Sequence, residues 1–206
     1  MAERAETSRA LADLLRDAPR FIAEASLLPL RAYQLAVAQA VLDSVLQRRG
    51  LSFVVMFPRQ SGKNELQAQL EAYLLLLFSE AGAEIVKVSP TWKPQSLNAM
   101  RRLQRVLETN RLTGPLWRKE SGYIYRVGRA RIFFLSGAPE TNIVGATAGT
   151  LLEVDEAQDV TIAKFDKDIA PMAASTNATR VFWGTAWTAS TLLARCLLYT
   201  SPSPRD

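Results

Sequence analysis

An apolar run that ends in a glycine–lysine turn constrains the fold of this chain more than any other feature. Residues 53–57 are apolar, the sequence Arg-Gln-Ser-Gly-Lys-Asn follows at 59–64, and a helix-forming stretch comes next. A buried strand, a tight turn and a helix in this order present backbone N–H groups and one lysine to phosphates. The segment therefore predicts a phosphate-binding loop, with Gly62 allowing close backbone approach and Lys63 reaching the β and γ phosphates.

The loop departs from the full Walker A pattern at both of its ends. Phe57 stands where the first glycine of the pattern would be, and Asn64 stands where a Mg²⁺-binding hydroxyl would follow the lysine. An amide oxygen is a weaker ligand for a hard cation, so we expect Asn64 to act as a Mg²⁺ ligand, directly or through water. Gln60 and Ser61 complete the expected nucleotide-binding loop. The alternative is an ordinary strand-to-helix turn that happens to contain glycine and lysine.

A second apolar stretch, residues 151–154, ends in two adjacent carboxylates. We expect Asp155 to hold the Mg²⁺ shell and Glu156 to orient and deprotonate the attacking water, because that role needs a carboxylate near the γ phosphate. The alternative is a helix N-terminus, where acidic residues are favoured. Glu153 interrupts the apolar stretch, and its simplest interpretation is a polar face at the margin of the sheet.

Apolar runs alternate with helical patterns along the rest of the chain. Strands are expected at 51–57, 83–88, 123–127, 131–135, 151–154 and 180–183, and helices at 5–25, 32–47, 62–78, 95–108, 162–173 and from about 190. The run at 51–57 is typical of a strand that is buried on both faces and central in a parallel sheet. The alternation predicts an α/β three-layer sandwich with a mainly parallel central sheet.

Composition excludes several kinds of chemistry. The chain has no histidine, which rules out Ser-His-Asp triads and His-ligated zinc, and its one cysteine, Cys196, allows no disulfide within the chain. The formal net charge of +5 permits an anionic partner. No segment reads as a signal peptide or is apolar for long enough to span a bilayer, so we expect an intracellular protein without membrane contact.

The last residues, 196–206, differ in character from everything before them. Read back through ordinary codons, CLLYTSPSPRD resembles the transposase mosaic end and adapter used in DNA library preparation. We therefore expect a helical extension at 1–27, one domain at 28–195 and an adapter-derived tail at 196–206, with the gene cut near Arg195. The alternative is a Ser/Pro linker to another domain.

Three segments together resemble the large terminase subunits of tailed phages: RQSGKNE, GATAGTLLEVDEAQDV and VFWGTAWT. The resemblance covers residues 28–188. It implies a P-loop NTPase domain of the RecA-like ASCE type that hydrolyses ATP with Mg²⁺ to drive double-stranded DNA into a procapsid. It also implies a following RNase H-like nuclease domain, which this chain lacks. The implied partners are the DNA backbone, a portal protein, a small terminase subunit and other copies in a homo-oligomeric ring, in the host cytoplasm and at the portal vertex.

The same resemblance suggests roles for four further positions. Gln34 resembles the residue that reads adenine, Arg59 the arginine that stabilises the γ phosphate, and Gly184 with Thr185 the motif that couples hydrolysis to movement. The alternatives are a solvated glutamine, a surface salt bridge and a plain strand-end turn.

Two groups of arginines could contact DNA backbone or a neighbouring subunit's nucleotide, although solvated faces are the more common explanation. They are Arg101, Arg102 and Arg105 on one expected helix, and Arg126, Arg129 and Arg131 beside the expected hairpin.

Two other functions stay open at this level. The Asp-Glu-Ala-Gln sequence that starts at Asp155 also resembles the second motif of helicases, which would predict a second RecA-like lobe. Alternatively, the chain is a nucleotide-binding module that is inactive without partner subunits.

Overall fold

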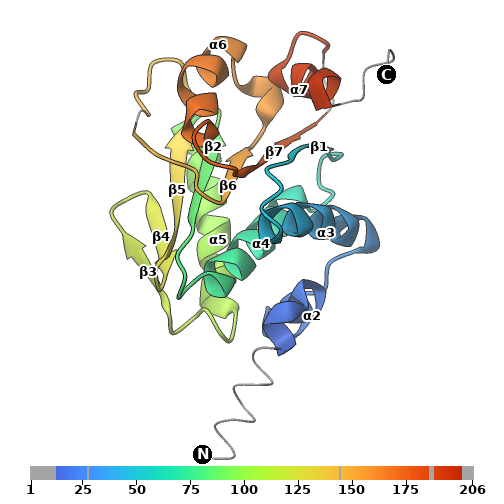
Figure 1. The fold of residues 1–206 in the computed structure, drawn as a ribbon, viewed down its shortest axis with the longest axis vertical. Coiled ribbons are helices and arrows are strands. Elements are labelled where there is room, and N and C mark those ends of the chain that lie inside the picture. The colour runs from blue at the N-terminus through green and yellow to red at the C-terminus, as the bar shows by residue number, and fades with distance from the viewer. Residues whose placement is uncertain (1–12, 27, 144, 186–187, 201–206) are drawn as a thin grey trace, which may run out of the picture.

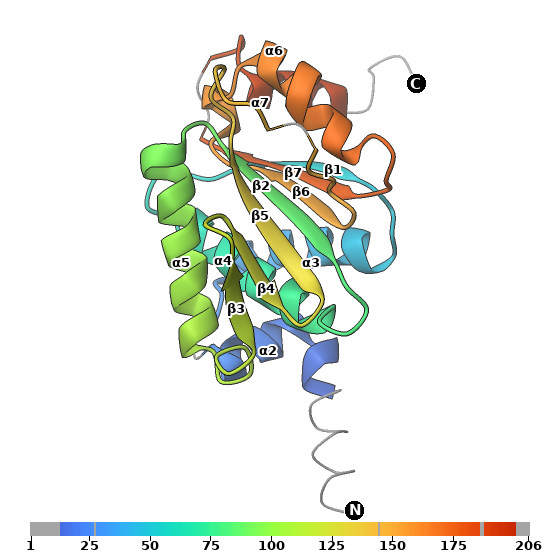
Figure 2. The same ribbon diagram turned by 90° about the vertical axis from the view of Figure 1, so that its left-hand side faces the viewer.

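The computed structural model describes residues 13–26, 28–143, 145–185 and 188–200, which form a central sheet with helices on both faces (Figures 1 and 2). Within these residues the sheet has seven strands in the order β1-β7-β6-β2-β5-β4-β3. The strands are β1 (Ser52–Met56), β2 (Glu84–Ser89), β3 (Trp117–Glu120), β4 (Ile124–Val127), β5 (Ala130–Ser136), β6 (Leu151–Val154) and β7 (Thr179–Gly184). β1, β7, β6, β2 and β5 are parallel to one another, and β4 and β3 continue the sheet in antiparallel pairing. The predicted α/β architecture with a mainly parallel sheet is confirmed.

The helices divide into two layers. They are α2 (Ala18–Ala25), α3 (Ala32–Leu46), α4 (Lys63–Leu77), α5 (Leu97–Thr109), α6 (Ile162–Lys164) and α7 (Leu192–Thr200). One apolar cluster packs helices α2, α3, α4 and α5 against one face of the sheet. A second cluster packs α6, α7 and the neighbouring turns against the other face. Figure 2 shows the sheet between these layers.

The prediction that the strand before the loop is central in the sheet is wrong. β1 lies at the edge of the described sheet and pairs with β7, and Met56 is 45% exposed. An apolar run indicates that both faces of a strand are covered. Both faces of β1 do contact apolar clusters, through Phe53 on one side and Val54 on the other. The run carries no information about whether another strand pairs along its edge.

Two expected helices are interrupted. Within the described part of 5–25, a first turn ends at Asp17, whose side chain caps α2 by accepting a hydrogen bond from Arg20 N at 3.0 Å. The expected helix at 162–173 consists of α6, a π turn at Phe165–Ile169 and a 3-10 turn at Ala170–Ala173. Pro171 has no N–H for a continued helix, which explains the change of geometry there.

The ends of the chain fall partly outside the described residues. Residues 196–200 lie in α7, whereas 1–12 and 201–206 are not described, so the expected extension and tail stay predictions. Within the described part of the chain, no helix is long and apolar enough to cross a membrane.

Candidate nucleotide-binding site

The carboxyl ends of β1, β6 and β7 and the first turn of α4 enclose a cleft of about 330 Å³. In parallel α/β sheets, ligands bind at this edge, beyond the carboxyl ends of the strands. The cleft is lined by residues 58–65 together with Arg102, Glu156 and Thr185. The structure thus brings together the loop and the second carboxylate, which lie about ninety positions apart in the sequence.

The loop backbone has the shape that a phosphate-binding turn needs. Gln60 and Gly62 both have positive φ angles, 61° and 84°. Gly62 caps α4, and a Cβ there would lie 2.6 Å from the Nε2 atom of Gln34. Glycine is the residue that adopts this conformation without steric cost, so Gly62 is required both by its φ angle and by space.

Gln34 is not a solvated glutamine. It is 5% exposed, its Nε2 donates to Gly62 O at 3.1 Å, and its Oε1 accepts from Arg31 N at 2.9 Å. The side chain therefore fixes the loop to the start of α3. Its expected contact with adenine stays a prediction.

Lys63 connects the loop with the two carboxylates at the end of β6. Its Nζ lies 2.6 Å from Glu156 Oε1 and 3.5 Å from Asp155 Oδ1, and Lys63 is 8% exposed. Lys63 thus lies within 3.5 Å of both the carboxylate expected to hold a metal, Asp155, and the carboxylate expected to act as the base, Glu156. P-loop NTPases place a lysine and carboxylates around the phosphates of a nucleotide in a comparable arrangement.

Asp155 has one oxygen held by the protein and one available. Its Oδ1 accepts hydrogen bonds from Gln67 Nε2 at 3.1 Å and from Glu156 N at 3.0 Å. Among the described residues, no donor reaches its Oδ2. These residues also contain no group of three or more His, Cys, Asp or Glu suited to a metal. A Mg²⁺ ion would fit if nucleotide phosphates completed its shell, because Mg²⁺ commonly binds through one or two carboxylates plus phosphates and water.

Gln158 links the base to the end of β7, and the sequence analysis missed it. Its Nε2 donates to Glu156 Oε2 at 2.7 Å, and its Oε1 accepts from Thr185 N at 3.2 Å. A Cβ on Gly184 would lie 2.4 Å from this Oε1, so only glycine leaves room for the link. The signal was available in the Asp-Glu-Ala-Gln sequence, since Gln158 follows Glu156 by two positions. The coupling role of Gly184 and Thr185 stays a prediction, now with a physical connection to Glu156.

Arginines approach the cleft from two sides. Arg59 lies in the loop and forms no ion pair with a described residue, so the surface salt bridge considered for it is not found there. Arg102, from α5, also lines the cleft, and its Nη1 lies 3.1 Å from Glu65 Oε2. Arg105 pairs with the same carboxylate at 3.3 Å. Thus two arginines of α5 pair with a glutamate in the first turn of α4, although the side chain of Arg105 stays mostly exposed.

A buried group of charges lies beneath the cleft, between α4 and the sheet. Lys87 Nζ donates to Glu71 Oε1 and to Gln67 Oε1, both at 2.6 Å. Glu153 pairs with Lys87 in the β-ladder and accepts from Trp183 Nε1 at 2.8 Å. Lys63, Gln67 and Glu71 recur every fourth position, so they form a polar stripe on one side of α4.

The interpretation of Glu153 as a residue at the sheet margin is wrong. Glu153 lies on β6, in the interior of the sheet, and its side chain is fully buried, as is that of Glu71 on α4. Burial, then the negative charge of Glu71, raises the pKa of Glu153 well above its ordinary value. Glu153 Oε2 and Glu71 Oε2 have no hydrogen-bond partner among the described residues. A proton on Glu153 leaves one carboxylate and one ammonium in the interior, which balances the buried charge.

Solved structures of phage proteins share this fold, whereas no family model and no curated protein sequence matches the chain. The large terminase of bacteriophage HK97 superposes with a TM-score of 0.65 at 16% identity over 87% of this chain. The ATPase domain of the Thermus phage P74-26 large terminase gives 0.59 at 18% identity over 80% of the chain. The chain has the fold of a phage large-terminase ATPase domain. It spans 40% of the HK97 protein and 68% of the P74-26 domain.

A third similar structure bears on nucleotide binding. The large terminase of the thermophilic bacteriophage D6E was solved in complex with ATP-γ-S, and it superposes with a TM-score of 0.51 at 16% identity. The superposition covers 76% of this chain and 38% of the D6E protein. At this identity the likeness concerns the fold, so the chemistry has to be argued from the residues of this chain.

Proposed function

We propose that the chain is the ATP-hydrolysing motor domain of a phage large terminase, which drives double-stranded DNA into a procapsid. The observation that carries the proposal is the meeting of Lys63, Asp155 and Glu156 within 3.5 Å at the carboxyl edge of the sheet. A turn at the start of α4 adds the backbone N–H groups of a helix N-terminus, which favour phosphate.

The proposed reaction is the attack of water on the γ phosphorus of ATP. Lys63 moves its contact from Glu156 to the phosphate oxygens, which frees the Glu156 carboxylate to accept a proton from the water. The bond from the γ phosphorus to the bridging oxygen breaks, and ADP and phosphate leave. Arg59, which has no carboxylate partner among the described residues, is placed in the loop to stabilise the developing charge. A bound Mg²⁺, held by Asp155 and Asn64, would neutralise phosphate charge.

Gln158 is the proposed connection from hydrolysis to movement. It contacts Glu156 with one end of its amide and Thr185 with the other. Thr185 Oγ1 in turn lies 3.4 Å from Phe57 O, at the start of the loop. A change in the position of Glu156 during turnover would therefore reach the end of β7 through a single side chain.

Glu156→Gln tests the assignment of the base. The variant keeps the size of the side chain and removes proton acceptance, so we expect turnover to fall by about 100-fold or more, with ATP affinity nearly unchanged. ATP affinity is measured by isothermal titration, and phosphate release by a coupled assay. Glu140→Gln is the matched control, because it makes the same chemical change at an exposed carboxylate outside the cleft lining. Normal turnover of Glu156→Gln would disprove the assignment.

A nucleotide-binding module without independent turnover is the second candidate. The 2.6 Å pair of Lys63 with Glu156 favours it, because the lysine occupies the base until phosphate displaces it. Under this candidate the chain binds ATP but releases no phosphate until a neighbouring subunit contributes to the site. Phosphate release measured over a range of chain concentrations distinguishes the two candidates: constant turnover per chain supports the motor domain, and turnover that appears only at high concentration supports the second candidate.

The remaining assignments rest on the resemblance to large terminases. They are a homo-oligomeric ring, contact with a portal protein and a small terminase subunit, and transient location at the portal vertex in the host cytoplasm. A pull-down of portal protein, with Glu156→Gln as the stalled form, tests the contact with the portal protein.

A further inference from the structure

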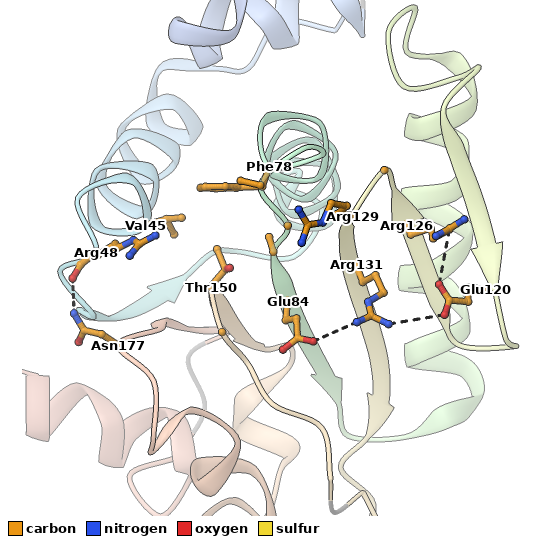
Figure 3. A pocket seen from close by; sticks show the side chains of 15 residues that line it. Val45, Arg48, Phe78, Glu84, Glu120, Arg126, Arg129, Arg131, Thr150 and Asn177 are labelled. Carbon is orange, nitrogen blue, oxygen red and sulfur yellow. Dashed lines mark hydrogen bonds and ion pairs between the residues drawn. The ribbon is translucent and has the colours of Figure 1, made fainter.

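A second cleft lies among the described residues at the opposite edge of the sheet from the nucleotide site. It has a volume of about 800 Å³ and lies where β2, β5 and β6 begin, between the last turns of α3 and α4 (Figure 3). Four arginines line it, Arg48, Arg126, Arg129 and Arg131, against two glutamates, Glu84 and Glu120. We call it the arginine cleft. Its formal charge excess is positive, which favours an anionic ligand.

The two glutamates are already paired with two of the arginines. Arg131 lies between them, with Nη2 3.5 Å from Glu84 Oε1 and Nη1 3.9 Å from Glu120 Oε1. Arg126 Nε lies 3.8 Å from Glu120 Oε2. Arg48 and Arg129 form no ion pair with any described residue. Their charges are therefore available to a ligand.

Arg129 is held at one wall of the cleft by its backbone. Its N donates to Ser79 O at 2.6 Å, and its Nη1 donates to Glu80 O at 3.3 Å. The preceding Gly128 has a φ of 56°, and a Cβ there would lie 2.4 Å from Ser79 O. The turn is thus pressed against the end of α4, which positions the arginine before any ligand binds.

Arg48 is held at the other wall. It ends α3 in the left-handed region, with a φ of 51°, and its carbonyl accepts a hydrogen bond from Asn177 Nδ2. Glycine or asparagine usually fills this position at the end of a helix, because other side chains cost energy there. The other described non-glycine residues with positive φ angles are Gln60 and Glu156 in the nucleotide site and Ser121 in the turn after β3. Non-glycine residues in this region cluster at ligand sites.

We propose that the arginine cleft binds the phosphodiester backbone of duplex DNA, with Arg48 and Arg129 as the principal contacts. This inference rests on the proposed function, which supplies DNA as the partner. Strands β7, β6, β2 and β5 follow one another across the cleft, and neighbouring strands lie ~4.8 Å apart, so its walls stand on the order of 14 Å apart. A cleft of that width can contact several phosphates along a DNA backbone. Its lining has no pair of aromatic rings between which a single nucleotide base could stack. ATP and DNA would bind at opposite edges of the sheet and could be held together.

The test is the binding of a fluorescein-labelled duplex by anisotropy over a series of salt concentrations. For Arg48→Gln/Arg129→Gln we expect affinity to fall about tenfold or more and the slope of log K against log salt to lessen by about 2, one unit for each lost phosphate contact. ATP hydrolysis without DNA should stay at the wild-type rate, which separates this inference from the assignment of the nucleotide site.

The matched control is Arg16→Gln/Arg111→Gln, which removes two exposed arginines that lie outside the cleft lining, one before α2 and one in the turn after α5. It should leave affinity unchanged. A second variant, Glu84→Gln/Glu120→Gln, removes the cleft's acidic groups and releases Arg126 and Arg131, so duplex affinity should rise. Misfolding cannot produce that gain.

Three outcomes would overturn the proposal. The first is a wild-type chain that does not bind duplex, and the second is a loss of binding in the Arg16/Arg111 control but not in the cleft variant. The third is that inorganic phosphate, at matched ionic strength, displaces the labelled duplex as effectively as unlabelled duplex does. That result would make the cleft a site for small anions.

Discussion

Strands β2 and β6 each place one charged residue among apolar neighbours on the face toward α4, whereas their buried residues on the face toward α6 and α7 are apolar. Lys87 and Glu153 lie on the first face, opposite Glu71, and all three are buried. Val86, Val88, Leu152 and Val154 lie on the second face, in one apolar cluster. Apolar burial stabilises a fold directly, whereas a buried ion pair is weak evidence of stability because desolvation offsets the attraction.

The difference between the faces concerns position as much as stability. The charged face leads through Gln67 to Asp155, the expected metal ligand, and through the same helix to Lys63. Hydrogen bonds have preferred directions, so they can fix the orientation of a carboxylate, which apolar contacts cannot do. Apolar clusters cover both faces and stabilise the fold, and we infer that the charged group on the α4 face also orients the nucleotide site.

The largest effect is expected from Lys87→Met. This change leaves Glu71 and Glu153 buried without their cation, so the free energy of unfolding should fall by about 3–5 kcal/mol. Urea denaturation followed by circular dichroism measures it. The double variant Lys87→Met/Glu71→Gln removes the uncompensated charge and should regain much of the loss. A single variant as stable as the wild type, or a double variant no better than the single one, would contradict the comparison.

A cavity on the apolar face should cost about 3 kcal/mol without affecting chemistry. Leu152 is fully buried, and Leu152→Ala removes its packing against the α6 and α7 layer. Urea denaturation gives the stability, and phosphate release per folded molecule at low temperature gives the turnover. A large drop in turnover by folded molecules would show that the apolar face also positions the site.

The sequence predicted the strand–turn–helix geometry of the loop and the strand that ends at Asp155 because each depends on local pattern, whereas the chemical roles of these residues stay predictions. Gly62, Lys63, Asp155 and Glu156 lie within short segments whose strand and helix character is visible in the residues. Glu153 was misjudged because its partners, Lys87 and Glu71, are far away in the sequence and on other elements. A single charged residue in an apolar run does not reveal whether the fold places an oppositely charged side chain beside it.

Long-range pairing also explains the other errors. The edge position of β1 depends on which strands pair beside it, and β3 was missed because its residues are polar and half exposed. The arginine cleft joins residues from the ends of α3, β4 and β5, so only the folded chain brings them together.

Gln67→Met should impair turnover more than stability. The variant keeps the volume and removes the amide that donates to Asp155 Oδ1 and accepts from Lys87. Groups that orient a metal ligand typically contribute 10- to 100-fold in metal affinity or activity, so we expect turnover to fall by about tenfold and the Mg²⁺ concentration for half-maximal activity to rise.

Gln69→Met is the matched control for this change. Gln69 is a buried glutamine on the same helix. Its Nε2 donates to Glu65 and not to the buried group formed by Lys87, Glu71 and Glu153. Its replacement should leave the Mg²⁺ requirement unchanged. Equal effects of the two changes would mean that Gln67 acts only through the stability of α4.

The smallest effect, and the most specific, is expected from Glu153→Gln, which keeps the size of the side chain and the hydrogen bond from Trp183. Because burial raises the pKa of Glu153 in the folded protein, the folded chain holds a proton that the unfolded chain has already released. That contribution to stability is complete below the ordinary glutamate pKa and is lost as pH rises toward the raised pKa of the folded state. Urea midpoints measured from acid to alkaline pH should therefore decline in the wild type over that interval, and the decline should be absent in Glu153→Gln. Parallel curves for the two proteins would mean that Glu153 is ionised in the fold and that Lys87 balances both carboxylates.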